Sequence, residues 1–407
     1  MAAVNTASTL TSYLKEVYPD DISVVVPRKT TTLQYFKYDQ QLQMGEKAKI
    51  PLQVTDEHGF AAKDGAGSLT LATPVAHEAV HYEVGPYQLA LRVRISYDLA
   101  AQASSSKKAF KVWNEKRFIP IIESAQKRLN VVATYGRDSI GEVDSINSND
   151  IVLKEAAWAP HIWLGAKGAE IDVFSAKTGG SQRNSTTLVI TAINSSTRTI
   201  TVSGTHSSIQ QGDFIFYRNF RGQEAYGLFG LARGSSGTIY TVNHGTYEVL
   251  QANAYDCGTS QLSLGKILEA ASASHDKGCD ERLVCMVPGK AFAHLVSNES
   301  ALRQYGGELR AKNGFKTLDF SLGDIDMEVV PNGVIKRGEF ILAPERYTSR
   351  IGSTDWTMTL PGQSNEELVL HVADSTDYEM RIYTAQTMVC ERMSWITYGT
   401  RSDGGVL

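Results

Sequence analysis

Apolar residues along this chain follow two different periods, one after the other. From Leu89 to Ile95 every second residue is apolar, which is the period of a half-buried β-strand. After serines at 104–106, apolar residues recur at helical spacing, at 110, 113, 118, 121, 125, 129 and 132. Serine is a favoured N-terminal cap, and Gly136 stands where a left-handed C-terminal residue is expected. The pattern predicts a strand and then one long helix over about 104–135, kinked at Pro120.

The first forty-five residues have the character of an arm that packs on another surface. Leu10, Tyr13, Leu14 and Val17 form one short amphipathic helical face, which ends at Pro19. Beyond it the segment is extended and polar. We therefore expect these four side chains to make assembly contacts.

Residues 46–95 predict a long two-stranded excursion. The segment 47–54 alternates, and we expect its return strand at 89–95. Between them lies a glycine-rich tip whose candidate contact residues are Glu57, His58, Phe60 and Lys63. A loop of this length is usually functional, and an isolated two-stranded ribbon is marginal in water. A partner surface should therefore cover it.

The composition changes after the helix. Residues 182–250 are rich in Thr, Ser, Gly and β-branched residues, and 188–192 with 199–202 flank a hairpin turn at 194–197. Another strand is expected at 214–217, so this region predicts a small inserted β-unit. The last third is mixed, with helices at 262–273 and from 291, strands at 283–287, 327–330 and 340–342, and exposed-edge strands at 367–372 and 378–382.

Bulk properties set wide limits on function. A chain of 407 residues implies two or three packed units, and a net charge of −4 gives no reason to expect a nucleic-acid-binding surface. No apolar run approaches the roughly 18–20 residues that cross a bilayer, so no membrane partner is expected. The N-terminus lacks a signal peptide's apolar core, and the four cysteines show no framework spacing. We expect a protein that stays in the cytosol, with Cys285 buried in its apolar run.

One motif has the pattern of an enzyme site. His77, Glu78 and His81 match the H-E-x-x-H signature, in which a helix presents two zinc ligands and a general base. The extended form of that signature requires a glycine and a histidine where this chain has Val84 and Tyr87. We therefore expect a loop or strand here and no metal or cofactor, with a zinc metalloprotease as the enzyme alternative. No nucleophile elbow, phosphate loop or dinucleotide fingerprint is present.

The predicted helix also carries a basic cluster. Seven Lys and Arg residues lie between 107 and 128, against two glutamates. A solvated helix face is the simpler interpretation. The alternative is that Lys107, Lys108 and Lys111 face an acidic scaffold or, later, DNA.

The order of these parts resembles the major capsid proteins of tailed double-stranded DNA bacteriophages, the Hong Kong 97-type fold. The resemblance is carried by the arm at 13–18, the loop entry at 45–52, and the spine region at 94–98 and 109–136. Further support comes from the small β-insertion with 199–202 and Gly212, and from Tyr226-Gly227-Leu228 downstream.

This resemblance implies an α+β fold with an N-terminal arm, an extended β-loop, a long spine helix, a mixed α/β body and an inserted small β-unit. The implied divisions are an arm at 1–45, the loop at 46–90, a peripheral domain at 91–181, the insertion at 182–250, and an axial domain returning to the peripheral domain at 251–407.

The implied function is structural: self-assembly into hexamers and pentamers of an icosahedral head that encloses double-stranded DNA. Implied partners are further copies, a separate scaffolding protein, a portal and, in some relatives, a decoration protein. The implied location is the virion, reached through the host cytoplasm. Some relatives cross-link a loop lysine to a neighbour, but for Lys63 an exposed, solvated lysine is the simpler interpretation. A bacterial nanocompartment shell shares the fold and remains the structural alternative.

Overall fold

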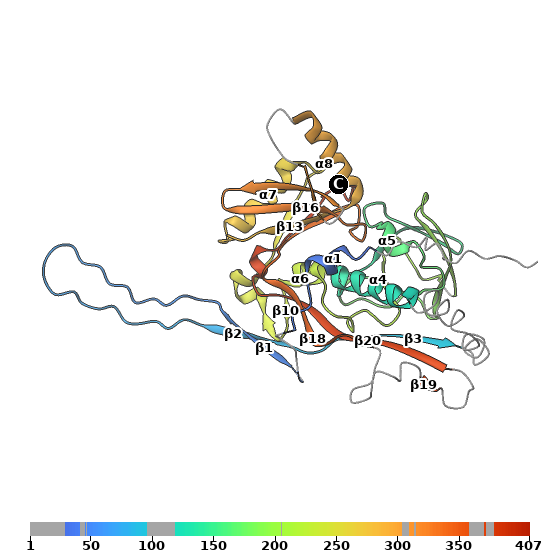
Figure 1. The fold of residues 1–407 in the computed structure, drawn as a ribbon, viewed down its shortest axis with the longest axis horizontal. Coiled ribbons are helices and arrows are strands. Elements are labelled where there is room, and N and C mark those ends of the chain that lie inside the picture. Colours follow the sequence, from blue (N-terminus) through green and yellow to red (C-terminus); the bar gives the residue numbers. More distant parts are fainter. Residues whose placement is uncertain are drawn as a thin grey trace, which may run out of the picture.

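The computed structural model describes residues 29–40, 45, 47–95, 119–204, 206–302, 309–312, 315–357, 370–371 and 378–407. Figure 1 shows a body built around helix α4 (Ile119–Tyr135), with a two-stranded ribbon projecting far to one side. A β-barrel and a seven-stranded sheet form the other two parts of the body.

Helix α4 confirms the predicted spine helix over the described residues 119–135. Of its predicted apolar positions, Ala125, Leu129 and Val132 are buried and Ile121 is half-buried. The stretch 104–118, with Lys107, Lys108 and Lys111, lies outside the described residues, as does the arm with Leu10, Tyr13, Leu14 and Val17. Pro120 is the second described residue of α4, so the predicted kink is not tested.

Gly136 ends the helix for a different reason from the one predicted. The left-handed residue is Arg137, with φ 69°, whereas Gly136 still donates to the Val132 carbonyl at 2.7 Å. A Cβ on Gly136 would lie 2.0 Å from the carbonyl oxygen of Ala225. Glycine is required here because α6 (Leu228–Gly234) begins directly against the end of α4.

The ribbon differs from the prediction in its second strand. β1 (Ala48–Gln53) pairs antiparallel with β2 (Ala79–Val84), in a register that places Ile50 opposite Tyr82. The segment that was expected to return along β1 forms β3 (Gln88–Ile95), and this strand pairs with β20 (Tyr378–Cys390) in the body. The ribbon is thus a separate hairpin, and β3 returns the chain to the core.

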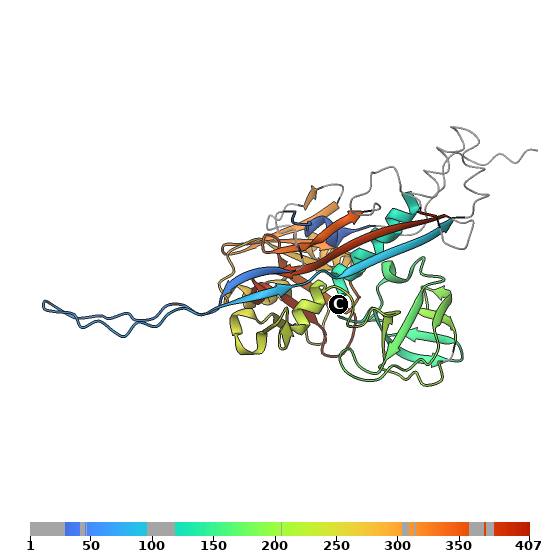
Figure 2. The same cartoon turned by 90° about the horizontal axis from the view of Figure 1, so that it is seen from below.

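β20 is the central strand of a long sheet, although its sequence suggested an exposed edge. It pairs with β18 (Thr348–Thr357) on one side, and β3 and the short β19 (Leu370–His371) also pair with it. Figure 2 shows β3 and β20 running side by side along the molecule. Helix α1 (Thr31–Tyr35) packs on α4, where the hydroxyls of Thr32 and Thr134 lie 2.8 Å apart.

A closed barrel is the second part of the body. Its strand order is β4-β5-β8-β7-β6-β9, with bounds Gly141–Asn147, Asp150–Leu153, Thr199–Ser203, Leu188–Asn194, Glu170–Phe174 and Phe214–Tyr217. The predicted hairpin is confirmed as β7 and β8, and the strand at 214–217 as β9. The predicted start of the β-unit at residue 182 falls inside this barrel, whose first strand begins at Gly141. Helix α5 (Pro160–Trp163) follows β5.

The third part is a mixed sheet of order β12-β21-β17-β13-β16-β15-β14. These strands run Asn253–Asp256, Thr397–Thr400, Glu339–Pro344, Leu283–Val287, Ile325–Pro331, Phe315–Leu322 and Leu309–Lys312. Helices α7 (Leu264–His275) and α8 (Gly289–Leu302) belong to this part, and the side chain of Ser263 caps α7. Cys285 is fully buried in β13, as predicted.

Several short elements complete the described fold. They are β10 (Thr238–Ile239), β11 (Val242–Asn243), and the 3-10 turns η2 (His244–Thr246), η3 (Glu248–Leu250) and η5 (Met393–Trp395). Among the helices of the described chain, none combines the length and apolar character that crossing a bilayer requires.

Candidate assembly surface

The loop that joins β1 to β2, residues 54–78, projects away from the body (Figures 1 and 2). The described residues include five large hydrophobic side chains that are well exposed, and four of them lie in this loop. Phe60 is 89% exposed and Leu71 81%, and the others are Leu69 and Val75. Apolar side chains gathered on one projecting segment make this loop a candidate contact surface, because exposed apolar patches are typical of interaction sites.

Sparse backbone contacts hold the loop in an extended shape. His58 and Val75 exchange two backbone hydrogen bonds, of 3.0 and 2.7 Å, across the two sides of the loop. Gly59 follows with φ 139°, a backbone conformation that residues other than glycine rarely adopt. The loop is therefore a continuation of the ribbon with few internal contacts.

The four predicted contact residues of the tip all belong to this loop and are all exposed. Glu57 pairs with His77 at 3.0 Å, and Lys63 donates to the carbonyl of Ser68 at 3.0 Å. His58 bridges the loop by pairing with Val75, and the Phe60 side chain is 89% exposed. Their role in assembly stays a prediction.

The base of the ribbon is fixed to the body by aromatic packing. Tyr82 of β2 is 1% exposed, and its ring stacks on His244 of η2 with centroids 5.5 Å apart. The Tyr240 ring lies 5.7 Å from the Tyr82 ring, and the Tyr240 hydroxyl donates to the carbonyl of Met388 in β20. The backbone of Tyr240 also accepts a hydrogen bond of 3.1 Å from the amide of Glu83. The body therefore sets the direction in which the loop projects.

The H-E-x-x-H residues lie on extended chain, as expected, and not on a helix. His77 pairs with Glu57, Glu78 accepts from the Tyr247 hydroxyl at 2.5 Å, and His81 in β2 lies 3.5 Å from Glu83. Four residues of extended chain span about 13 Å, too far for two histidines to share a zinc ion at roughly 2.1 Å each. Within the described residues no group of three or more His, Cys, Asp or Glu side chains is placed to hold a metal.

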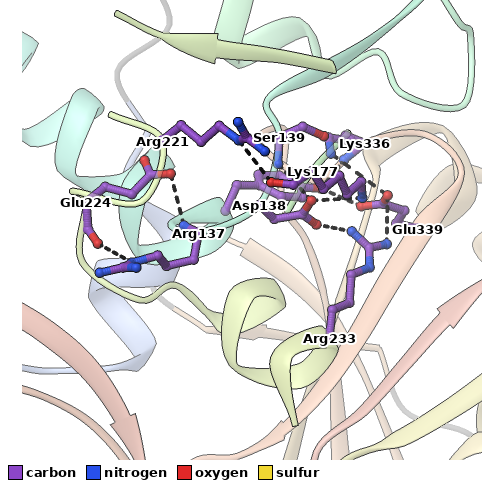
Figure 3. Close-up of polar contacts among 10 residues, drawn as sticks. Arg137, Asp138, Ser139, Lys177, Arg221, Glu224, Arg233, Lys336 and Glu339 are labelled. Atoms are coloured by element: carbon purple, nitrogen blue, oxygen red, sulfur yellow. Dashed lines mark hydrogen bonds and ion pairs between the residues drawn. The ribbon is translucent and has the colours of Figure 1, made fainter. Parts of the chain in front are cut away.

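A buried charge cluster lies where the three parts of the body meet (Figure 3). Asp138, just after α4, pairs with Lys177 at 2.8 Å and with Arg233 of α6. Arg233 also pairs with Glu339 of β17 at 2.9 Å, and Lys336 lies 3.9 Å from the same carboxylate. The cluster thus ties the end of the spine helix to the barrel side and to the seven-stranded sheet.

Burial and pairing act against each other in this cluster. Burial alone would raise the pKa of Asp138, but the charges of Arg233 and Lys177 outweigh it and hold this pKa well below its usual range. Burial lowers the pKa of Lys336 to about 8, although Glu339 favours the charged form. The sequence analysis did not identify this cluster, because Arg233 is 95 positions from Asp138 and 106 from Glu339. No local pattern marks residues so far apart.

Comparison with known proteins finds similarity in structure and none in sequence families. No protein-family model matches the sequence, and no curated protein does. A chain of the capsid asymmetric unit of cyanophage A-1(L) superposes with a TM-score of 0.55 at 10% identity, covering 97% of this chain and 99% of that one. The fold is that of a phage capsid protein.

Two further structures cover almost the whole chain at lower structural similarity. A structure from Mycobacterium phage Bobi has a TM-score of 0.49 at 11% identity, covering 98% of this chain and 99% of that one. An encapsulin complex from Synechococcus elongatus has a TM-score of 0.44 at 9% identity, covering 98% of this chain and 96% of that one. The cyanophage match, with the higher TM-score of 0.55, is the one that confirms the predicted fold class.

Proposed function

We propose that this chain is a major capsid protein, a subunit that assembles into hexamers and pentamers of an icosahedral phage head. The observation that carries the proposal is the projecting loop, because it exposes Phe60, Leu71, Leu69 and Val75 on a capsid-protein fold. A second copy would cover these side chains. The resulting head would enclose double-stranded DNA and would form in the host cytoplasm.

The work of such a subunit is repeated association and involves no chemistry. The loop of one copy would lie on the next copy and bury its apolar side chains, at about 25 cal/mol per Å² of apolar surface removed from water. Ordering costs offset part of that gain, so a stable shell sums many modest contacts. Head-to-tail contacts of this kind generate closed rings when the rotation between copies closes.

The charge of the chain is compatible with a container. At −4 overall, the wall would hold DNA without the strong, salt-dependent grip that phosphate contacts give. A separate scaffolding protein and a portal are part of the proposal, and a decoration protein is an optional partner. The basic residues Lys107, Lys108 and Lys111 are proposed to face the scaffold or the DNA.

Expression of the full chain, alone and with a candidate scaffolding protein, tests the proposal. Negative-stain electron microscopy should show rings, shells or polyhedral sheets. Monomers under both conditions, at concentrations up to the solubility limit, would contradict it. If shells form, their content separates the two structural alternatives, since a nanocompartment encloses a cargo enzyme and a phage head receives DNA through a portal.

A further inference from the structure

A cavity of 640 Å³ opens beside the charge cluster, between the barrel, α6 and β10. Four cationic side chains line it, against the single carboxylate of Asp138. These cations are Arg137, Lys177, Arg221 and Arg233. Aromatic rings share the lining, so the cavity offers both positive charge and apolar surface.

Two of the cations have no carboxylate partner within the described chain. The Arg221 guanidinium donates to the carbonyls of Lys177 and Gly179 and lies 4.1 Å from the centroid of the Phe174 ring. Arg137 donates through Nε to the carbonyl of Glu224 at 2.8 Å and lies 4.8 Å from the centroid of the Tyr226 ring. Stacking on an aromatic ring holds a guanidinium in place while its other N–H groups remain available to bind a carboxylate.

The nearby carboxyl group of Glu224 does little to neutralise Arg137. Burial raises the pKa of Glu224 to about 8, despite the hydrogen bond from the Arg137 amide. This group is therefore mostly protonated at neutral pH. The cavity keeps its excess of positive charge.

The projecting loop has the complementary character. Residues 54–78 carry four carboxylates against one lysine. Asp56 and Asp64 are exposed and form no ion pair or hydrogen bond among the described residues, and Phe60, 89% exposed, lies between them in sequence. An acidic loop with an aromatic side chain fits a cationic cavity lined by rings better than it fits a neutral surface.

The loop points away from the cavity of its own chain. Thr238 and Ile239 of β10 line the cavity, and the next residue, Tyr240, packs on Tyr82 at the base of the ribbon. The tip, in contrast, extends far from the body (Figure 1). A twelve-residue extended segment reaches about 40 Å, so the tip meets only the cavity of another copy.

We propose that this cavity, marked by Arg137 and Arg221, is the receiving site for the loop tip of a neighbouring copy, with Asp64 at the tip as the incoming carboxylate. The inference rests on the proposed function and names the surface that the loop contacts. Because the donor is the ribbon tip and the acceptor lies beside the ribbon base, the contact is head-to-tail. The ribbon length then sets the spacing between adjacent copies.

Disulfide trapping in assembled particles tests the site directly. The full chain is made with Asp64→Cys and Arg221→Cys, and the four native cysteines are buried, which limits background. A matched control combines Asp64→Cys with Lys290→Cys, a lysine whose side chain is 61% exposed on α8. After oxidation, a non-reducing gel should show a ladder of covalent oligomers for the first pair, at least tenfold above the control.

The outcomes separate this inference from the proposed function. Shells with no ladder, or with equal ladders for both pairs, would overturn the receiving site while leaving the capsid function intact. Failure of the wild-type chain to form any shell with its scaffold would overturn both.

A charge-reversal cycle keeps the test open if the cysteine variants fold poorly. Asp64→Lys and, separately, Arg221→Glu should each lower shell yield about tenfold, the effect of roughly 1.4 kcal/mol per contact. Combining both changes in one chain should restore the yield to within about threefold of wild type. A combined variant no better than the worse parent would show that these charges do not meet.

Discussion

The ring of Tyr82 in β2 stacks on the imidazole of His244 in η2, with centroids 5.5 Å apart and planes at 14°. This contact joins the projecting ribbon to the body, because Tyr82 is paired with Ile50 of β1 inside the ribbon while His244 belongs to η2 of the body. The Tyr82 hydroxyl is buried and has no hydrogen-bond partner among the described groups. The buried ring of Tyr82 therefore stabilises the fold, and its hydroxyl does not.

Tyr82→Ala and Tyr82→Phe should consequently have opposite effects. The alanine variant should lower the free energy of unfolding by about 3–5 kcal/mol, as expected for truncating a buried aromatic ring. The phenylalanine variant should match wild type or exceed it by up to about 1 kcal/mol, since an unpaired buried hydroxyl is removed. Urea unfolding of the unassembled chain measures both. Equal losses for the two variants would show that the hydroxyl has a partner.

Gly136→Ala should be far more damaging than a typical surface glycine change. Its Cβ would lie 2.0 Å from the Ala225 carbonyl oxygen and 3.0 Å from the Gly227 amide nitrogen, so α4 and α6 would have to separate. We expect a loss of at least about 1–3 kcal/mol and a reduced soluble yield. Gly85→Ala is the matched control, because nothing lies within 4 Å of its Cβ. Thermal unfolding of both variants decides the point.

The sequence predicted local elements well and long-range relationships poorly. The period of 3.6 in the spine region and the alternation in 188–202 were strong enough to give α4, β7 and β8. The return strand of the ribbon was placed wrongly, although Val80, Tyr82 and Val84 alternate, because 89–95 alternates over a longer run. The strand at 88–95 pairs instead with β20, nearly 300 positions away in the sequence, and no local period encodes such a pairing.

The charge cluster and the cavity show the same limit. Asp138, Arg233 and Glu339 are ordinary charged residues in sequence, and only the meeting of α4, α6 and β17 makes them one network. The loop tip was predicted from local composition, because glycine-rich exposed segments are recognisable without their partners. A receiving surface assembled from several distant segments cannot be recognised from local composition.

The extended geometry of the H-E-x-x-H segment makes a simple prediction against the zinc alternative. Purified protein should contain less than about one zinc ion per ten chains, because extended chain holds His77 and His81 too far apart to share a metal. Elemental analysis by mass spectrometry after extensive dialysis measures this, with His77→Ala as the comparison. One zinc per chain, lost in His77→Ala, would restore the metalloprotease interpretation and contradict the extended geometry.

The pH dependence of stability should carry the signature of Lys336. Burial lowers its folded-state pKa to about 8, whereas an unfolded lysine has a pKa of about 10.4. Below pH 8 both states hold the proton, so burial of the charge weakens the fold by an amount independent of pH. Between about pH 8 and 10 the folded chain has released the proton and the unfolded chain has not, so the free energy of unfolding rises with pH, by on the order of 2–3 kcal/mol.

The difference in unfolding free energy between wild type and Lys336→Met isolates this effect, because other titrating groups contribute to both chains. It should rise in favour of wild type from pH 8 to pH 10 and stay flat from pH 6 to 7.5. Lys290→Met, at a lysine 61% exposed, should give a difference that changes little over the same range. A flat difference for Lys336→Met would mean that Glu339, 3.9 Å away, compensates the burial fully and that this lysine keeps its ordinary pKa.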